Sequence, residues 1–239
     1  MQLGLSSEAA MDAPVSELLV ACVRRGIGTL ELVLNPAIGP DEVLLAARMM
    51  DDLAVRISGI VTDACPDTQA LAVLSRMADA PIIVRGEYDL SSRIACAREI
   101  CLEGGTALVF VSGPPDSWLD TITYTGVEFA WHVDETCQDP AAAAERILHA
   151  RRIAAIRLAG GGPETAMQDE RGIGALMRVL AIEGYDGPLI MTPSSQRYRV
   201  VWAAWLGRRG GWGCGSKSDK TGRSVPLKLE RGMSVADSR

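Results

Sequence analysis

The residues best suited to chemistry in this sequence are a histidine and an aspartate two positions apart, His132 and Asp134. Histidine transfers protons near neutral pH, and a neighbouring carboxylate tunes its proton affinity. The only other histidine, His149, falls at the end of an expected helix, where we interpret it as a surface residue. If the protein is an enzyme, we expect His132 and Glu87 to transfer protons and Asp134 to orient the histidine.

A second set of residues could hold an anion. Arg157 can form two parallel hydrogen bonds with a phosphate or a carboxylate, and three glycines follow it at positions 160–162. Backbone N–H groups of such loops bind phosphate in many parallel barrels. A flexible loop with an ordinary helix cap explains the same residues without a ligand. The residues that we expect to contact a substrate are Glu31, Arg85, Arg157, Gly160, Gly161, Thr192, Ser194 and Ser195.

These side chains need a scaffold, and short apolar strands alternate with segments of helical period along most of the chain. Asp139-Pro140 is a helix cap followed by proline at the first helical position, while Gly26, Gly104 and Gly184 follow expected helix ends. Strands are expected at 2–6, 29–34, 55–61, 81–85, 107–112, 128–133, 153–158 and 188–192. Helices are expected at 15–25, 40–52, 68–78, 91–103, 140–149, 172–183 and 197–206. The alternation predicts an α/β fold, a closed (β/α)8 TIM barrel of parallel strands, with an open doubly wound sheet as the rival.

Alternation along the strands predicts which side chains line the barrel. The leucines of 29–34 pack on helices, which turns Glu31 inward, and the same reasoning turns His132 and Arg157 inward. Barrel enzymes work at the carboxyl ends of their strands. An alternative interpretation is purely structural: an inward glutamate and an inward arginine neutralise each other, because an unpaired buried charge is costly. The side chains that we expect to gather at the carboxyl end are Glu31, Arg85, Glu87, His132, Asp134 and Arg157.

The opening QLGLSSE, followed by a helix, GIGTLELVLNP and LAVRISGIVTD, resembles the first three units of the xylose-isomerase-like TIM barrels. The stretch 174–190, which ends in IEGYDGPLI, is similar to the closing unit of the same family. The resemblance implies a sugar phosphate isomerase or epimerase that acts on, or binds, a small phosphorylated or carboxylated polyol. A non-catalytic binding or scaffold barrel, such as one encoded with a biosynthetic pathway, is the alternative. Kinship with the endonuclease branch is disfavoured, because that branch needs many metal-binding histidines.

The resemblance also implies a divalent metal ion (manganese, magnesium, cobalt or zinc) held by Glu, Asp, His and Glu at the ends of the last four strands. Most of this pattern is missing. Ser112 and Thr192 stand near strand ends where glutamates belong, and Arg157 stands where a ligand histidine would. A guanidinium stays charged and repels a cation. We therefore expect no cofactor; if a metal ion binds, the remaining ligands are His132, Asp134 and Glu135, helped by Glu87 or Asp63.

Composition excludes several classes of protein. Hydrophobic residues make up 48% and charged residues 23% of the 239 positions, which is typical of a globular chain. Without a membrane-length apolar run, an export signal or a CxxC pair, we expect a cytoplasmic protein with reduced cysteines. The net charge of −6 gives no general attraction to nucleic acid. The expected partner is a small sugar or polyol, without a membrane partner, and a homodimer stays open.

Charge divides the chain into two parts. Residues 207–239 contain eight basic and three acidic residues, a net charge of +5, so residues 1–206 carry −11. We predict a barrel over 1–206 and a basic extension with glycine and tryptophan over 207–239, disordered from about residue 216. A solvated tail that folds back on the acidic body is the simpler reading, and contact with RNA or an acidic partner is the other.

Overall fold

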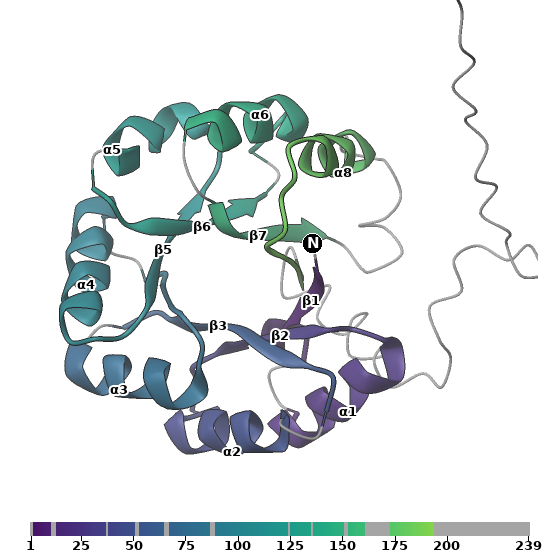
Figure 1. Cartoon of the computed structure of the whole chain (residues 1–239), viewed down its shortest axis with the longest axis vertical. Coiled ribbons are helices and arrows are strands. Elements are labelled where there is room, and N and C mark those ends of the chain that lie inside the picture. The colour runs from purple at the N-terminus through teal and green to yellow at the C-terminus, as the bar shows by residue number, and fades with distance from the viewer. Residues whose placement is uncertain are drawn as a thin grey trace, which may run out of the picture.

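A closed barrel of parallel strands forms the body of the protein, as predicted. The computed structural model describes residues 2–10, 13–36, 38–50, 53–64, 67–86, 89–123, 125–134, 136–150, 153–160 and 173–193. Neighbouring strands pair in sequence order, and β8 closes on β1 (Figure 1). The strands are β1 (Gln2–Ser6), β2 (Thr29–Val33), β3 (Arg56–Thr62), β4 (Ile82–Val84), β5 (Ala107–Ser112), β6 (Glu128–Val133), β7 (Ile153–Gly160) and β8 (Pro188–Pro193).

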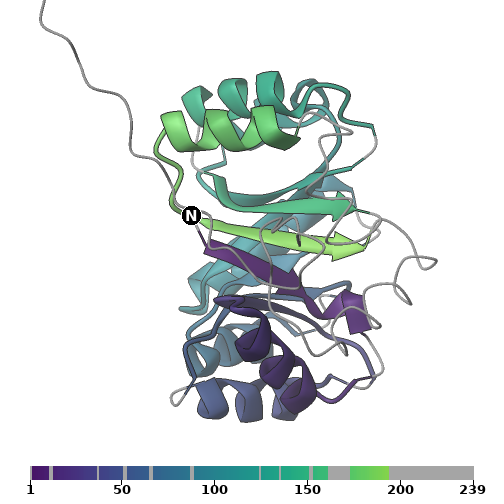
Figure 2. The same ribbon diagram turned by 90° about the vertical axis from the view of Figure 1, so that its right-hand side faces the viewer.

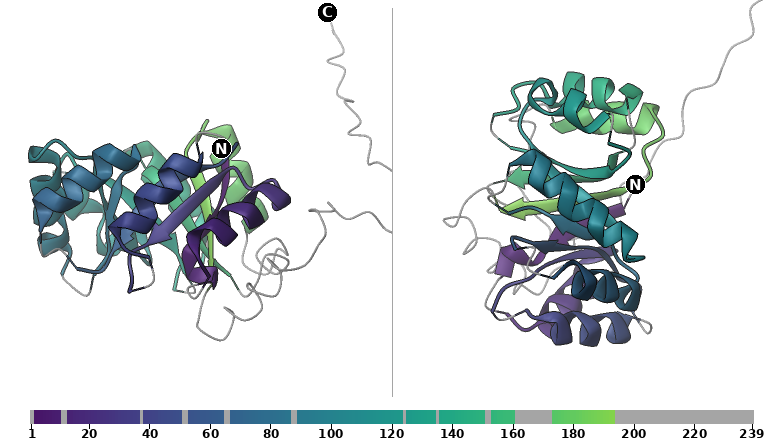
Figure 3. Two further views of the ribbon diagram at one scale, coloured as in Figure 1. Left: turned by 90° about the horizontal axis from the view of Figure 1, so that it is seen from below. Right: turned by 90° about the vertical axis from the view of Figure 1, so that its left-hand side faces the viewer.

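Helices surround the strands on the outside of the barrel (Figures 1 and 3). They are α1 (Val15–Arg25), α2 (Pro40–Met50), α3 (Thr68–Ala78), α4 (Leu90–Leu102), α5 (Leu119–Thr123), α6 (Pro140–Ala150) and α8 (Ile173–Ile182). Two 3-10 turns, η1 (Ser7–Ala10) and η2 (Pro115–Ser117), and the short α5 are elements that the periodicity did not predict. The predicted helix at 197–206 and the predicted basic extension lie outside the described residues. Within the described part of the chain, no helix is long and apolar enough to cross a membrane.

Local signals explain where several helices begin and end. The Asp139 carboxylate accepts a hydrogen bond from the Ala142 N–H at 3.0 Å, which confirms the predicted cap of α6. Asp67 and Asp89 cap α3 and α4 in the same way. Gly26 has a φ of 65°, the left-handed conformation expected after the end of α1. These caps set where the chain turns from each helix back into the barrel.

Two apolar layers stabilise the barrel. One lies between strands and helices and includes Leu30, Leu32 and Trp131. The other fills the interior and consists of Val33, Val61, Ile83, Leu108, Phe110, Ala130 and Ala155. The predicted faces of β2 and β6 are therefore confirmed. At the start of β7 they are wrong: the pairing skips Ala154, so Ile153 joins the outer layer.

Among the cysteines that the structure describes, Cys96 differs from the prediction. Cys96 in α4 is disulfide-bonded, whereas Cys22, Cys101 and Cys137 are free thiols. The prediction that all cysteines are reduced is therefore wrong for Cys96. It rested on the absence of an export signal, which favours a compartment where thiols stay reduced.

Tight packing at Gly105, between α4 and β5, gives a first test of the fold. A Cβ atom there would lie 2.8 Å from the Cα of Ala72 in α3. We expect Gly105→Ala to lower the free energy of unfolding by about 1–3 kcal/mol, because α3 would have to move. Urea denaturation measures this. Gly28→Ala, whose Cβ would meet nothing within 4 Å, is the matched control, and equal losses in both variants would contradict the packing argument.

Candidate active site

Five charged side chains form a continuous chain of ion pairs at the carboxyl end of the strands. Arg157 in β7 donates to Oε1 of Glu31 in β2 from Nε at 3.1 Å and from Nη2 at 2.9 Å. The same Nη2 donates to Oε2 of Glu8 in η1 at 3.1 Å. Glu8 also binds Arg85, which donates to both carboxylate oxygens of Asp63 at 2.6 and 2.7 Å. We call Glu31, Arg157, Glu8, Arg85 and Asp63 the mouth network.

The fold brings these five residues together from separate elements. Asp63 and Arg85 directly follow β3 and β4, and the Arg85 N–H donates to the Thr62 carbonyl at 2.9 Å. Glu8 is held by the turn that follows β1. There the Ser7 hydroxyl oxygen accepts a hydrogen bond from the Val33 N–H of β2 at 2.8 Å. This bond ties η1 (the purple turn beside the strand ends in Figure 2) to the end of β2.

Burial increases along the mouth network towards the barrel axis. The Asp63 side chain is 55% exposed and that of Arg85 is 22% exposed, whereas Glu31 and Arg157 are 0% and 1% exposed. The Arg157 guanidinium also lies 5.1 Å from the centroid of the Phe110 ring, which favours the cation. An unpaired buried charge costs several kcal/mol, so Glu31 and Arg157 each offset the cost of burying the other.

The arginines hold the outer carboxylates in their charged forms. Burial alone would raise the pKa of Glu8, but Arg157 and Arg85 outweigh it, and the pKa is lowered. The hydrogen bond from Arg85 lowers the pKa of Asp63. In return, these carboxylates outweigh the burial of Arg85 and raise its pKa. At neutral pH both carboxylates are therefore anions and weak bases.

His132 faces the interior beside this network. In the strand pairing it is opposite Arg157 on one side and Ser112 on the other, and its ring centroid lies 5.4 Å from that of Phe110. Burial and then the Arg157 charge lower the pKa of His132 to about 4, against the opposing charges of Asp134 and Glu8. Its Nδ1 is buried without a hydrogen-bond partner among the described residues. At neutral pH His132 is therefore an uncharged imidazole.

Of the remaining predicted site residues, some are described by the structure and others lie outside the described residues. Asp134 accepts hydrogen bonds at Oδ1 from the N–H and hydroxyl of Thr136, at 2.9 and 2.6 Å, so its role towards His132 stays a prediction. The Thr192 hydroxyl donates to the Leu158 carbonyl at 3.3 Å, and Gly160 ends β7. Five predicted positions lie outside the described residues: Glu87, Glu135, Gly161, Ser194 and Ser195.

Sequence reasoning missed Glu8 as a site residue. It ends the QLGLSSE segment and comes directly after β1, which places it at the carboxyl end of the barrel, where site residues were sought. A search of every strand exit for charged residues would have found it. Asp63, predicted only as an auxiliary metal ligand, instead pairs with Arg85.

The residues present do not fit the metal ion implied by the family resemblance. The described residues contain no group of three or more metal-ligating side chains. Arg157, within β7, is a buried guanidinium. Its ion pairs with Glu31 and Glu8 place a positive charge of the chain itself between these two carboxylates.

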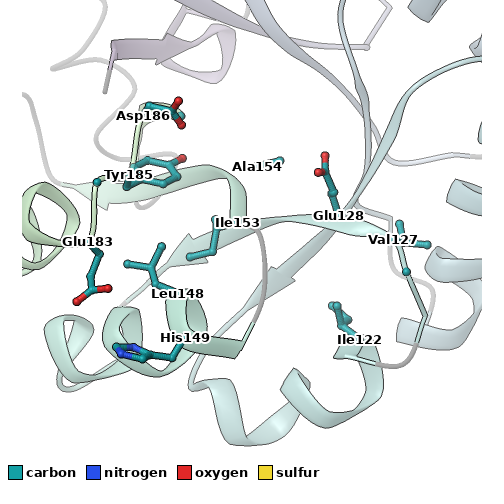
Figure 4. A pocket seen from close by; sticks show the side chains of 13 residues that line it. Ile122, Val127, Glu128, Leu148, His149, Ile153, Ala154, Glu183, Tyr185 and Asp186 are labelled. Carbon is teal, nitrogen blue, oxygen red and sulfur yellow. The ribbon is translucent and has the colours of Figure 1, made fainter.

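A groove of about 850 Å³ lies at the opposite, amino-terminal end of the strands. Figure 4 shows Glu128, Glu183 and Asp186 among the residues that line it, together with Leu148, His149 and Ile153. The three carboxylates and His149 are exposed, and His149 belongs to the last turn of α6, as predicted. We take the mouth network as the candidate active site instead, because buried polar side chains from several strands converge there among the residues that the structure describes.

Comparison with solved structures supports the resemblance at the level of the fold. A D-tagatose 3-epimerase-like protein has a TM-score of 0.64 and 12% identity, covering 86% of this chain and 96% of its own. A D-allulose 3-epimerase from Methylomonas sp., solved in complex with D-allulose, has a TM-score of 0.60 and 11% identity over 82% and 85% of the two chains. A xylose isomerase domain protein from Planctomyces limnophilus has a TM-score of 0.58 and 11% identity over 85% and 93%. No protein-family model and no curated protein matches the sequence. The chain therefore has the fold of the xylose-isomerase-like TIM barrels.

The mutual dependence of Glu31 and Arg157 is testable through stability. We expect Glu31→Gln to lower the free energy of unfolding by about 3–5 kcal/mol, because it leaves a buried guanidinium with less compensation. The matched control is Asp116→Asn, which removes the exposed ion pair with Arg146 and should leave the free energy of unfolding almost unchanged. Urea denaturation compares the two, and a small loss in Glu31→Gln would show that the pair is not important for stability.

The low pKa of His132 predicts a pH dependence of stability. The folded-state pKa of about 4 lies below the ordinary 6.5, so the unfolded chain takes up a proton more readily. This stability is fully present above pH 6.5 and is lost as the pH falls towards 4, by up to about 3 kcal/mol. The free energy of unfolding, measured with urea at pH 7, 5.5 and 4.5, should fall less steeply with decreasing pH in His132→Phe than in the wild type. His149→Gln should keep the wild-type slope, and an unchanged slope in His132→Phe would contradict the burial of a neutral histidine.

Proposed function

We propose that this protein is a sugar-isomerase- or epimerase-like barrel that takes a small polyol at the mouth network without a metal ion. The observation that carries the proposal is the buried Glu31–Arg157–Glu8 arrangement beside His132 at the carboxyl ends of the strands. Support comes also from the fold, which is shared with the D-allulose 3-epimerase solved with its sugar. Polyol hydroxyls both donate and accept hydrogen bonds, which suits a site made of carboxylates and a neutral imidazole.

The charges favour an uncharged sugar over a phosphorylated or carboxylated one. The mouth network holds three carboxylates and two guanidinium groups, a net charge of −1. Both arginines already bind carboxylates, and the Thr192 hydroxyl donates to a backbone carbonyl. An anion would meet a net negative charge at the mouth. The predicted phosphate contacts at Gly161, Ser194 and Ser195 lie outside the described residues, so a sugar phosphate is the second ligand class to test.

Isomerisation or epimerisation of a sugar requires removal of a proton next to a carbonyl group and stabilisation of the enediolate that forms. In our proposal the neutral imidazole of His132 donates a hydrogen bond to that oxygen, a role for which a low pKa is suited. Glu8 and Asp63 are weak bases because the arginines lower their pKa. We therefore assign proton abstraction to Glu87.

A non-catalytic sugar-binding barrel is the second candidate. It is favoured because the described carboxylates around the mouth already have partners: three bind arginines, and Asp134 accepts hydrogen bonds from Thr136. Each of these carboxylates therefore already has an ion-pair or hydrogen-bond partner. Catalysis then depends on Glu87.

Exchange with solvent deuterium separates the two candidates. The full chain, treated with EDTA, is incubated with D-allulose, D-tagatose or D-fructose in D2O, and proton NMR follows the sugar C–H signals next to the carbonyl. We expect saturation transfer from protein to sugar and loss of one C–H signal, both unaffected by EDTA. Binding without exchange would favour the non-catalytic barrel, and the absence of both would refute the proposed function.

Matched variants locate the activity. Glu87→Gln should keep sugar binding and lower the exchange rate at least 100-fold, in line with the loss of a general base. Glu183→Gln, on the rim of the groove at the opposite end of the barrel, should exchange at the wild-type rate. Parallel binding measurements with the corresponding sugar phosphates test the charge argument, since tighter binding of the phosphates would contradict it.

A further inference from the structure

The groove at the amino-terminal end of the strands, which we call the amino-end groove, contains carboxylates without basic partners. Glu128, Glu183 and Asp186 line it and are exposed, and none of them forms an ion pair with a described basic residue. Arg151 and Arg152, which precede β7, lie outside the described residues, but the carboxylates outnumber them. In the mouth network, by contrast, every carboxylate binds an arginine. A ligand that brings positive charge therefore complements the amino-end groove.

Apolar side chains lie in the same groove. Ile122, Val127, Leu148 and Ile153 line it alongside the carboxylates (Figure 4). Val127 and Leu148 are only half-buried, so a ligand with apolar groups would remove more of their surface from water. The volume of about 850 Å³ has room for several side chains of a ligand. The groove therefore fits a short peptide that contains both apolar and basic residues.

The chain itself contains such a peptide. Segment 223–231, with the sequence RSVPLKLER, has three basic residues and one acidic residue, a net charge of +2. Pro226 near its middle disfavours a helix. The apolar residues fall at every second position, which places them on one side of an extended chain. They are Val225, Leu227 and Leu229.

We propose that segment 223–231 docks in the amino-end groove of its own chain. Its apolar side packs against Leu148 and Ile153, and its basic residues pair with the three groove carboxylates. This accounts for the division of charge in the sequence, since residues 1–206 carry −11 and residues 207–239 carry +5. The inference does not depend on what the mouth network binds.

The length of the chain permits this contact. The last described strand, β8, ends at Pro193, at the opposite end of the barrel. About 30 residues separate Pro193 from Arg223, and an extended chain of that length spans up to about 100 Å. β7, which has 8 residues, is only about 26 Å long. Because the segment is tethered, its local concentration at the groove is high, so contacts too weak to hold a free peptide are sufficient.

Lysine chemistry tests the proposal on the full chain, because every lysine lies in the extension: Lys217, Lys220 and Lys228. A carbodiimide joins a lysine amine directly to a carboxylate that it contacts, and mass spectrometry of tryptic peptides identifies each joined pair. We expect Lys228 to be joined mainly to the three groove carboxylates. Cross-links spread over the exposed carboxylates of the barrel, or no cross-link from Lys228, would overturn the proposal.

Matched variants test the contribution of charge. Glu183→Gln combined with Asp186→Asn should lower the yield of cross-links from Lys228 to the remaining groove carboxylate by about fivefold, because two ion pairs are lost. Glu99→Gln combined with Glu103→Gln removes the same charge from exposed positions at the end of α4, across the barrel from α8 (Figure 1). This control should keep the wild-type yield. Equal yields in the two double variants would contradict docking through the groove carboxylates.

Isotope mixing decides which chain supplies the segment. Chains labelled with ¹⁵N are mixed with unlabelled chains before cross-linking. Docking within one chain gives Lys228 cross-links in which both peptides carry the same isotope. Cross-links that join a labelled to an unlabelled peptide would assign the groove to the extension of a second copy, and the proposal would then be wrong.

Discussion

The structure depends on the pairing of one buried carboxylate with one buried guanidinium. Glu31 and Arg157 are almost fully buried and 126 positions apart in the chain. Neither could stay charged in the barrel interior without the other. Their strands, β2 and β7, are separated by β1 and β8, so the pair forms only when β8 closes on β1. Closure of the barrel and neutralisation of its interior therefore require each other.

The side chains inside the barrel change from apolar to charged along the barrel axis. The inner layer below is apolar, with Val61, Leu108 and Ala155. Towards the carboxyl ends it becomes charged, and Phe110 contacts both Arg157 and His132 at the boundary. The apolar neighbours desolvate His132 and keep it neutral at physiological pH. In the proposed function, a polyol would contact hydrogen-bonding groups that are mostly paired with each other and together carry a net charge of −1.

The fold is shared with sugar epimerases at only 10–16% sequence identity. Such low identity is expected if the fold depends on a pattern of residue types and not on particular residues. Its architecture requires alternating apolar strands and capped helices, and many sequences satisfy that pattern. Apart from the buried Glu31–Arg157 pair, the side chains at the strand ends can change without loss of this pattern.

The order of strands and helices, the caps at Asp139 and Gly26 and the inward faces of β2 and β6 could be predicted from the sequence, because each depends on local periodicity or backbone conformation. So could the presence of Glu31, His132 and Arg157 inside the barrel. Their partners could not be predicted. The role of Glu8 depends on a turn held by Ser7 and Val33, and the bulge at Ala154 depends on how β7 pairs with β6. Alternation specifies the face of a strand on which a charge lies, but only closure of the barrel specifies which opposite charge lies within hydrogen-bonding distance.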